Sequence, residues 1–250
     1  MSKISVKDKD IVVPGETLAE GMDYLPGSGT YRLKEKIIAK VLGLVNISGR
    51  AIKLVPLSGR YLPKVGDKII CKVTDIVMSG WIVNINTAYT AMIGMKDAST
   101  RFIKKGEDLT KYFDIGDYLR TKVVNVTSQR LVDLTMKEPG LNKLKGGRIL
   151  KVNPLKVPRI IGKQGSMVTL IKQKTNCNVV VGQNGLVWLK ADDPDNEYIA
   201  EQAVRKIEAE AHLGGLTDNI EKFLDKLVGT EKSKISGTSK NPEFLIGGKK

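Results

Sequence analysis

The sequence predicts a mixed fold in which two small all-β domains are followed by one α+β domain. Short apolar runs separated by glycine and proline fill roughly the first half of the chain, and such runs are typical of β structure. Further along, a Gly-X-X-Gly segment at residues 162–165 separates two short amphipathic stretches. The chain has 250 residues, which is room for two or three small domains.

Residues 1–65 form the first predicted β domain. Its apolar runs have the length of single strands and lie between turn residues; they cover residues 11–15, 25–31, 37–45 and 51–57. Residues 46–50 contain Ser48-Gly49 and are predicted to form a hairpin turn. The stretch 62–67 leads into the next domain.

Residues 66–137 form a second β domain with five predicted strands. The strands cover residues 67–78, 81–85, 89–93, 118–126 and 130–136. A more polar stretch, 94–113, separates the third strand from the fourth. Five strands with a longer insertion at this point are the layout of an OB fold, a small β-barrel that binds oligonucleotides on one face.

Residues 140–213 have the order strand, helix, helix, strand, strand, helix. The predicted strands are 148–153, 178–181 and 186–190, and residues 182–185 read as a plain turn between the last two. The final helix begins at Asp193-Pro194, since Asp is a good N-cap and Pro suits the first helical position. Residues 214–250 are predicted to be a short amphipathic helix capped by Asp218 and a polar tail, in which the apolar residues 244–246 suggest docking onto another surface.

The glycine segment at 162–165 is the strongest functional signal in the chain. Gly162 and Gly165 allow a tight turn and the close approach of a phosphodiester. The helix that follows directs its free N–H groups at the same place, and Lys163 adds a mobile positive charge. The pattern predicts a clamp for the backbone of single-stranded nucleic acid.

Charge supports a polyanionic partner. The formal net charge is +14 and the pI is about 9.6. Residues 139–191 contain no Asp or Glu, whereas a solvated surface normally mixes both signs. The basic residues of this stretch are Lys143, Lys145, Arg148, Lys151, Lys156, Arg159, Lys163, Lys172, Lys174 and Lys190.

Other classes of function receive little support from the sequence. No apolar run is long enough to span a bilayer and residues 1–10 are polar, so we expect a cytoplasmic protein. Cys71 and Cys177 lie in or beside apolar runs and are interpreted as buried thiols. His212 is the only histidine. We therefore expect no metal site, no cofactor and no catalytic residues.

The order of the three domains resembles a known family. Residues 140–213 resemble a KH domain of the eukaryotic-type topology, and residues 66–137 look like the OB fold of ribosomal protein S-one. The whole chain resembles the KH-bearing RNA-binding cap subunit of the archaeal exosome, over roughly residues 5–225. Further matching segments are residues 12–15, 27–31 and 80–86.

The resemblance implies a non-catalytic part in RNA degradation and processing. In that family three cap subunits sit on a hexameric ring of RNase-PH-like subunits. The N-terminal β domain holds the ring and the OB folds surround the entry pore. The cap gathers single-stranded RNA and feeds its 3′ end to phosphorolytic sites inside the ring.

The resemblance also assigns RNA-binding residues. The clamp would be Gly162, Lys163, Gln164 and Gly165, flanked by Arg159 and Lys156. In the OB fold, Ile82 and Gly94 stand where many such domains have Phe and His, so contact there would rely on charge. The charged candidates are Lys72, Arg120, Lys122 and Arg130. Trp81 and Tyr89 are candidate stacking platforms for bases. For Trp81, the alternative is a packing residue at a barrel edge or a subunit interface.

Two alternatives stay open at this level. One is a transcription or translation factor that uses the same modules without a nuclease; bacterial elongation factors combine them, with paired KH domains of the other topology. The other is an enzyme such as polynucleotide phosphorylase, which carries KH and OB modules in reverse order after two large catalytic domains. This chain has no room for such domains, and Asp108, Asp114 and Asp117 read as turn residues rather than a metal site.

Overall fold

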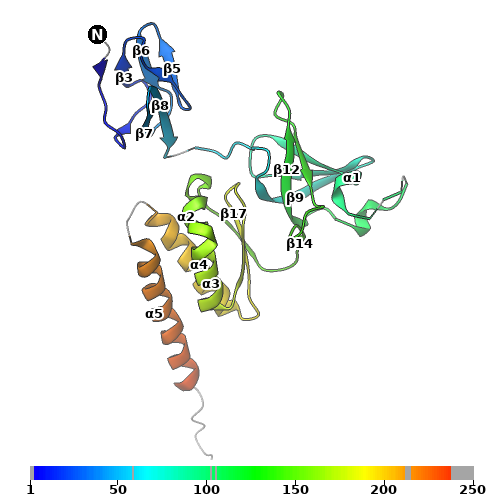
Figure 1. Cartoon of the computed structure of the whole chain (residues 1–250). Helices are drawn as coiled ribbons and strands as arrows, with labels where there is room; N and C mark the ends of the chain where they lie inside the picture. Colours follow the sequence, from blue (N-terminus) through cyan, green and yellow to red (C-terminus); the bar gives the residue numbers. More distant parts are fainter. Residues whose placement is uncertain (1–2, 58, 102, 105, 212–214, 238–250) are drawn as a thin grey trace, which may run out of the picture. The chain divides into compact units, whose positions relative to one another are not determined.

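The computed structural model describes residues 3–57, 59–101, 103–104, 106–211 and 215–237, with backbone alone for 228–237 (Figure 1). His212 and the apolar residues 244–246 singled out above lie outside this part of the chain. Two compact units are present: Met1–Tyr61 with Asn153–Leu155, and Leu62–Val152 with Lys156–Lys250.

The first unit is built from two four-stranded sheets. One has the order β1 (Lys3–Ile4), β3 (Thr17–Glu20), β6 (Lys36–Ala39), β5 (Thr30–Leu33), and the other β2 (Ile11–Val12), β7 (Gly43–Ser48), β8 (Ala51–Pro56), β4 (Leu25–Pro26). Leu18, Ile37 and Ile52 are among the residues of its core. The predicted hairpin is present, with a turn shortened to Gly49 and Arg50 because Ser48 already pairs with Ala51.

The second unit begins with a five-stranded barrel. Its strands are β9 (Lys68–Val77), β10 (Gly80–Asn84), β11 (Thr90–Gly94), β12 (Tyr118–Val126) and β13 (Val132–Thr135), and the pairing of β12 with β13 closes the barrel. Helices α1 (Met95–Ala98) and η1 (Leu109–Lys111) occupy the insertion before β12. The OB-type layout predicted from the sequence is confirmed. A short strand, β14 (Lys143–Leu144), pairs with β12.

The α+β part follows with the predicted order of elements. Strands β15 (Arg148–Lys151), β17 (Leu186–Lys190) and β16 (Asn178–Val181) form an antiparallel sheet in that order, named here the C-terminal sheet. The helices are η2 (Pro154–Lys156), α2 (Val157–Ile161), η3 (Lys163–Gly165), α3 (Ser166–Thr175), α4 (Pro194–Ala209) and α5 (Leu216–Gly237). Asp193 caps α4 by accepting a hydrogen bond from the N–H of Asp195, as expected.

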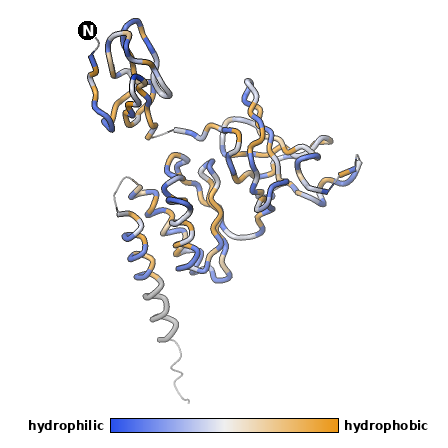
Figure 2. Tube along the Cα trace, in the orientation of Figure 1, coloured by the Kyte–Doolittle hydropathy of each residue, from blue (hydrophilic) through white to orange (hydrophobic). Residues whose placement is uncertain are grey.

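Helices cover one face of the C-terminal sheet. Alternate strand residues such as Leu150, Val179 and Leu189 pack with Ile160, Ile171 and the apolar faces of α4 and α5. Figure 2 shows hydrophobic and hydrophilic residues alternating along the described part of α5, the pattern of a helix buried on one side. Helix α5 begins at Leu216, two residues before the cap predicted at Asp218.

The other face of the C-terminal sheet packs against the barrel. Leu186 and Trp188 form a buried cluster with Ile70 and Leu144, and Ile149, Val180 and Tyr118 pack around it. The sheet is therefore enclosed on both faces, and the barrel and the α+β part fold as one unit.

Candidate nucleic-acid interface

The glycine loop, residues 162–165, adopts a conformation that requires glycine. Gly162 has φ 76° and ψ 175°, and Gly165 has φ 82°, in the region that side chains disfavour. A Cβ atom at Gly162 would lie 2.7 Å from the backbone nitrogen of Met167. Nothing lies within 4 Å of a Cβ atom at Gly165. Gly162 is thus required by both space and conformation, whereas at Gly165 the conformation only favours glycine.

Helix α3 starts directly after this loop, and no side chain caps its first turn; the N–H of Ser166 donates to the carbonyl oxygen of Lys163. Gly165 is the N-cap residue and supplies no side-chain acceptor. Uncapped N–H groups and the helix dipole favour an anion at this end of a helix. The start of α3 thus has the uncapped turn that the sequence analysis expects, and the clamp itself stays a prediction.

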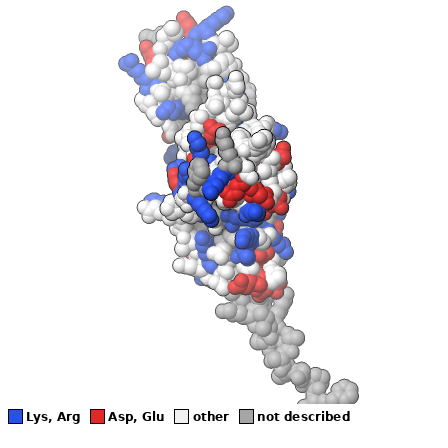
Figure 3. Space-filling view, turned by 90° about the vertical axis from the view of Figure 1, so that its right-hand side faces the viewer, with Lys and Arg blue, Asp and Glu red and all other residues white. Residues whose placement is uncertain are grey.

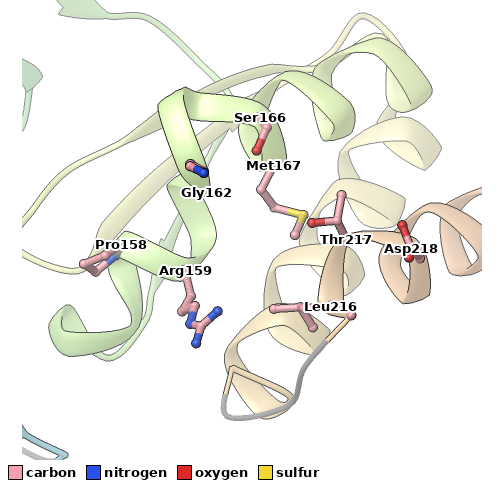
Figure 4. Close-up of a pocket in the computed structure, with 10 residues that line it drawn as sticks. Pro158, Arg159, Gly162, Ser166, Met167, Leu216, Thr217 and Asp218 are labelled. Carbon is pink, nitrogen blue, oxygen red and sulfur yellow. The ribbon is translucent and has the colours of Figure 1, made fainter.

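A cavity of about 520 Å³ lies beside the glycine loop (Figure 4). Helix α2 and the loop form one wall, and the first turn of α5 forms the other. Arg159 and Lys163 bring positive charge to it, and neither has an ion pair with another described residue. The lining residues are Pro158, Arg159, Gly162, Lys163, Ser166, Met167, Gly215, Leu216, Thr217 and Asp218.

Lys156 is placed elsewhere. Its Nζ donates a hydrogen bond to the carbonyl oxygen of Glu208, 2.8 Å away, near the end of α4. A lysine at that position satisfies a carbonyl that the helix leaves without an internal partner. Lys156 thus ties η2 to α4 and does not line the cavity with Arg159 and Lys163.

Acidic residues from outside the stretch 139–191 neutralise part of its charge. Arg148 lies 3.5 Å from Glu197 and 3.4 Å from Glu201, both on α4. Lys143 pairs with Asp117. Lys174 pairs with Asp225, and this hydrogen bond raises the pKa of the lysine. On the face shown in Figure 3, basic atoms likewise lie next to a group of acidic ones. The excess of positive charge is therefore local, and the cavity at the glycine loop is one place that retains it.

Comparisons with known proteins show which family the chain resembles. One matching family model is described as the N-terminal region of exosome complex exonuclease RRP4 and covers residues 11–48; a KH-domain model covers residues 147–195. A protein of Methanothermobacter thermautotrophicus named exosome complex component Rrp4 is 45% identical over 226 residues, which cover 90% of this chain and 71% of that protein. Its namesake in Methanothermus fervidus is 43% identical, over 88% of this chain and 96% of that one.

The chain belongs to the Rrp4 family.

A solved structure described as an RNA-binding protein of the exosome complex also matches the chain. It has a TM-score of 0.63 at 33% sequence identity, and the match covers 69% of this chain and 99% of that one. The resemblance stated from the sequence and the predicted fold class are both confirmed. The alternative of a transcription or translation factor is not favoured, because these Rrp4 relatives match about 90% of the chain.

Trp81 of this Rrp4-family chain is not a stacking platform. Its side chain is fully buried, and its Nε1 donates a hydrogen bond to the carbonyl oxygen of Phe113 at 2.9 Å. The ring meets that of Phe113 edge to face, with centroids 5.2 Å apart. Of the two interpretations, packing is therefore the correct one. Tyr89 is only partly buried, and the guanidinium of Arg130 lies 5.8 Å from its ring centroid.

Three other basic barrel residues lie beside the C-terminal sheet. Lys72 on β9 and Arg120 and Lys122 on β12 share the outer face on which the C-terminal sheet packs through Ile70 and Tyr118. Lys122 pairs with Glu138. The Nε of Arg120 is buried without a hydrogen-bond partner among the described residues. Lys72 is exposed on this face, whereas Lys122 and Arg120 are partly buried. The role in RNA binding expected of these three residues stays a prediction.

A second basic cavity, of about 450 Å³, lies on the barrel and was not predicted from the sequence. Residues Lys96 and Lys137 are distant in sequence and meet because β11 and β13 pair in parallel. No run or motif in the sequence links them. The lining residues are Met95, Lys96, Ser99, Thr100, Arg101, Ile103 and Lys137.

The acidic residues considered for a metal site take part in turns. Asp108 accepts a hydrogen bond from the N–H of Thr110, and Asp117 accepts one from the N–H of Asp114. Within the described ranges, no three His, Cys, Asp or Glu residues are grouped as metal ligands would be. Cys71 is fully buried, which raises the pKa of its thiol to about 12. Among the helices described, none is both long and apolar enough to cross a membrane.

Proposed function

We propose that this chain is a non-catalytic RNA-binding cap subunit of an exosome. It collects single-stranded RNA and passes the 3′ end to a ring of RNase-PH-like subunits that degrade it with phosphate. The observation that carries the proposal is the cavity at the glycine loop, which Arg159, Lys163 and the first residues of α3 line together, in a chain of the Rrp4 family.

The clamp holds the RNA backbone rather than its bases. Donors of the backbone and of Lys163 and Arg159 suit phosphate oxygens, which all sequences share. Sequence preference is therefore low and affinity depends steeply on salt. On a single strand, the slope of log affinity against log salt is about −0.7 for each phosphate contacted.

The N-terminal unit supplies a surface suited to a protein partner. Several of its large apolar side chains are exposed, and a partner protein can bury exposed apolar side chains. A domain that docks on a ring is expected to have such a surface. In this proposal three caps sit on one hexameric ring. The exposed residues are Ile11, Val13, Met22, Leu25, Tyr31, Leu33, Val55 and Leu57.

Four segments of the chain have separate roles. Residues 1–65 dock on the ring, residues 66–137 and 140–213 bind RNA, and residues 214–250 add a helix and a tail. The protein acts in the cytoplasm and uses no cofactor.

The test measures RNA affinity of the full chain carrying Gly162→Asp. A carboxylate in the phosphate position should lower affinity for single-stranded RNA at least tenfold. Gln129→Asp, in an exposed turn of the barrel, is the matched control with the same change of net charge. Because a Cβ atom at Gly162 also disturbs Met167, the double variant Arg159→Glu/Lys163→Glu tests the same site without altering the loop backbone.

The cap role itself is tested by reconstitution with the ring subunits. Addition of the chain should accelerate phosphate-dependent 3′→5′ degradation of long single-stranded RNA, and the Gly162→Asp variant should not. RNA degradation by the purified chain alone would contradict the proposal, and this check is needed because one matching family model is described as an exonuclease.

A further inference from the structure

A buried asparagine helps to hold the C-terminal sheet against the barrel. Asn184 lies in the loop 182–185, named here the anchor loop, and its side chain is fully buried. Its Nδ2 donates hydrogen bonds to the carbonyl oxygens of Ile70 at 2.6 Å and Ile85 at 2.9 Å. Its Oδ1 accepts one from the N–H of Ile70 at 3.3 Å. A side chain of the KH domain thus binds the backbone of barrel strand β9.

Backbone groups of the anchor loop reinforce this contact. The N–H of Gln183 donates to the carbonyl oxygen of Lys68 at 2.9 Å. The Nδ2 of Asn86 donates to the backbone carbonyl oxygen of Asn184 at 3.4 Å. Together with the apolar cluster around Trp188, these bonds fix the barrel and the C-terminal sheet against each other. Any cavity between them therefore has walls that are already in place before a ligand binds.

One such cavity, of about 120 Å³, lies where the barrel meets the C-terminal sheet. The barrel contributes Lys72, Asn84, Asn86 and Tyr118, and the sheet contributes Ile149, Lys151 and Leu186. Lys72 pairs across the strands with Asn84 on one side and Tyr118 on the other, so these three side chains form a row. We call this cavity the seam pocket.

The seam pocket has positive charge on both walls. Lys72 comes from the barrel and Lys151 from β15, and no Asp or Glu lines the pocket. Neither lysine has an ion pair with any residue in the described part of the chain. Two like charges beside one cavity repel each other, and an anion between them removes that cost.

We propose that the seam pocket binds a phosphate group of single-stranded RNA between Lys72 and Lys151. The amides of Asn84 and Asn86 and the Tyr118 ring surround the same position. The pocket volume of about 120 Å³ is enough for a phosphate group. The inference rests on the proposed function, since the same strand also occupies the glycine loop, and it adds a second backbone site that the barrel and KH domain form jointly.

The experiment measures binding of a fluorescent single-stranded RNA to the full chain by polarisation over a range of salt concentrations. The variants are Lys72→Glu, Lys151→Glu and the double change. Lys222→Glu, on the exposed surface of α5 and outside the described cavities, is the matched control with the same change of charge per residue. Lys72→Gln/Lys151→Gln removes both charges without reversing them.

Each single reversal should weaken binding at least threefold more than the control. In the Gln/Gln variant the salt slope should fall by about 0.7, the value of one lost phosphate contact on a single strand. Melting temperatures should stay close to that of the unchanged chain, because both lysines are exposed.

Two failures are distinguishable. If the unchanged chain binds RNA and Gly162→Asp lowers its affinity at least tenfold, but the Lys72 and Lys151 variants match Lys222→Glu, the seam pocket is not a phosphate site and the proposed function stands. If Gly162→Asp also binds as well as the unchanged chain, the proposed clamp fails as well.

Discussion

The chain contains two Gly-X-X-Gly segments that do different work. Residues 162–165 lie at the surface, beside a cavity with two basic side chains. In the anchor loop at 182–185, Asn184 is buried and bonded to the barrel backbone. The spacing of the glycines is the same in both segments. The residues between them, Lys163-Gln164 in one and Gln183-Asn184 in the other, decide whether the loop faces a ligand or a neighbouring domain.

The largest expected difference between the loops is in stability. Asn184→Ala leaves buried groups of Ile70 and Ile85 without partners, and each such loss costs roughly 1–3 kcal/mol. We expect the free energy of unfolding to fall by about 3 kcal/mol. Urea titration measures it.

The matched change in the other loop is Gln164→Ala. Its side chain is exposed, so the free energy of unfolding should change by less than about 0.5 kcal/mol. Similar losses for Asn184→Ala and Gln164→Ala would mean that the anchor loop does not join the two domains.

The glycines Gly182 and Gly165 should also differ in how much stability their replacement by alanine costs. A Cβ atom at Gly182 would lie 2.5 Å from Oδ1 of Asn184 and 2.8 Å from the nitrogen of Ile70. Gly182→Ala should therefore destabilise the chain by about 2 kcal/mol through overpacking. Gly165→Ala meets no atom within 4 Å but keeps a φ of 82°, which costs about 1 kcal/mol. Thermal unfolding of both variants ranks them, and the reverse order would contradict this account.

For RNA affinity, we expect the larger effect from changes in the glycine loop and the smaller effect from changes in the anchor loop. Lys163→Ala removes a charge beside the cavity of the glycine loop, and we expect about a fivefold loss of affinity for single-stranded RNA, of the order of one charge-assisted contact. Gln183→Ala, at the equivalent place in the anchor loop, should change affinity by less than twofold. Polarisation assays at one fixed salt concentration compare the two, and an equal loss in both would remove the distinction.

The smallest effect is expected for a paired lysine of the same basic stretch. Lys174 is held by Asp225 at 2.6 Å and Glu221 at 3.4 Å. Lys174→Ala should therefore leave RNA affinity unchanged within twofold, in contrast to Lys163→Ala. A loss as large as that of Lys163→Ala would show that the acidic neighbours do not neutralise Lys174 toward RNA.

The local sequence pattern was sufficient to predict the barrel strands, the start of α4 and the turn at residues 162–165. Strand-length apolar runs predicted the barrel strands, and Asp193-Pro194 predicted the start of α4. The conformation of Gly162 follows from a turn that only glycine adopts without strain.

Features that depend on packing between distant segments were not predictable. Alternation along β9 shows that Lys72 points outward, but not that the C-terminal sheet covers the neighbouring Ile70. The acids that neutralise Arg148 come from α4, about 50 positions away. Asn184 reads as an ordinary turn residue because its three acceptor and donor partners belong to another domain. The sequence around Trp81 would look the same whether its ring packs in the core or stacks on a base.

The enclosure of the C-terminal sheet has a consequence for how this protein is made. The ribosome synthesises the barrel before the C-terminal sheet is complete. Ile70 and Leu144 therefore stay uncovered until Leu186 and Trp188 have been synthesised. A fragment that begins after the barrel leaves those partners facing water. In evolutionary exchange of domains, barrel and KH domain are therefore expected to be gained, lost and transferred as a pair.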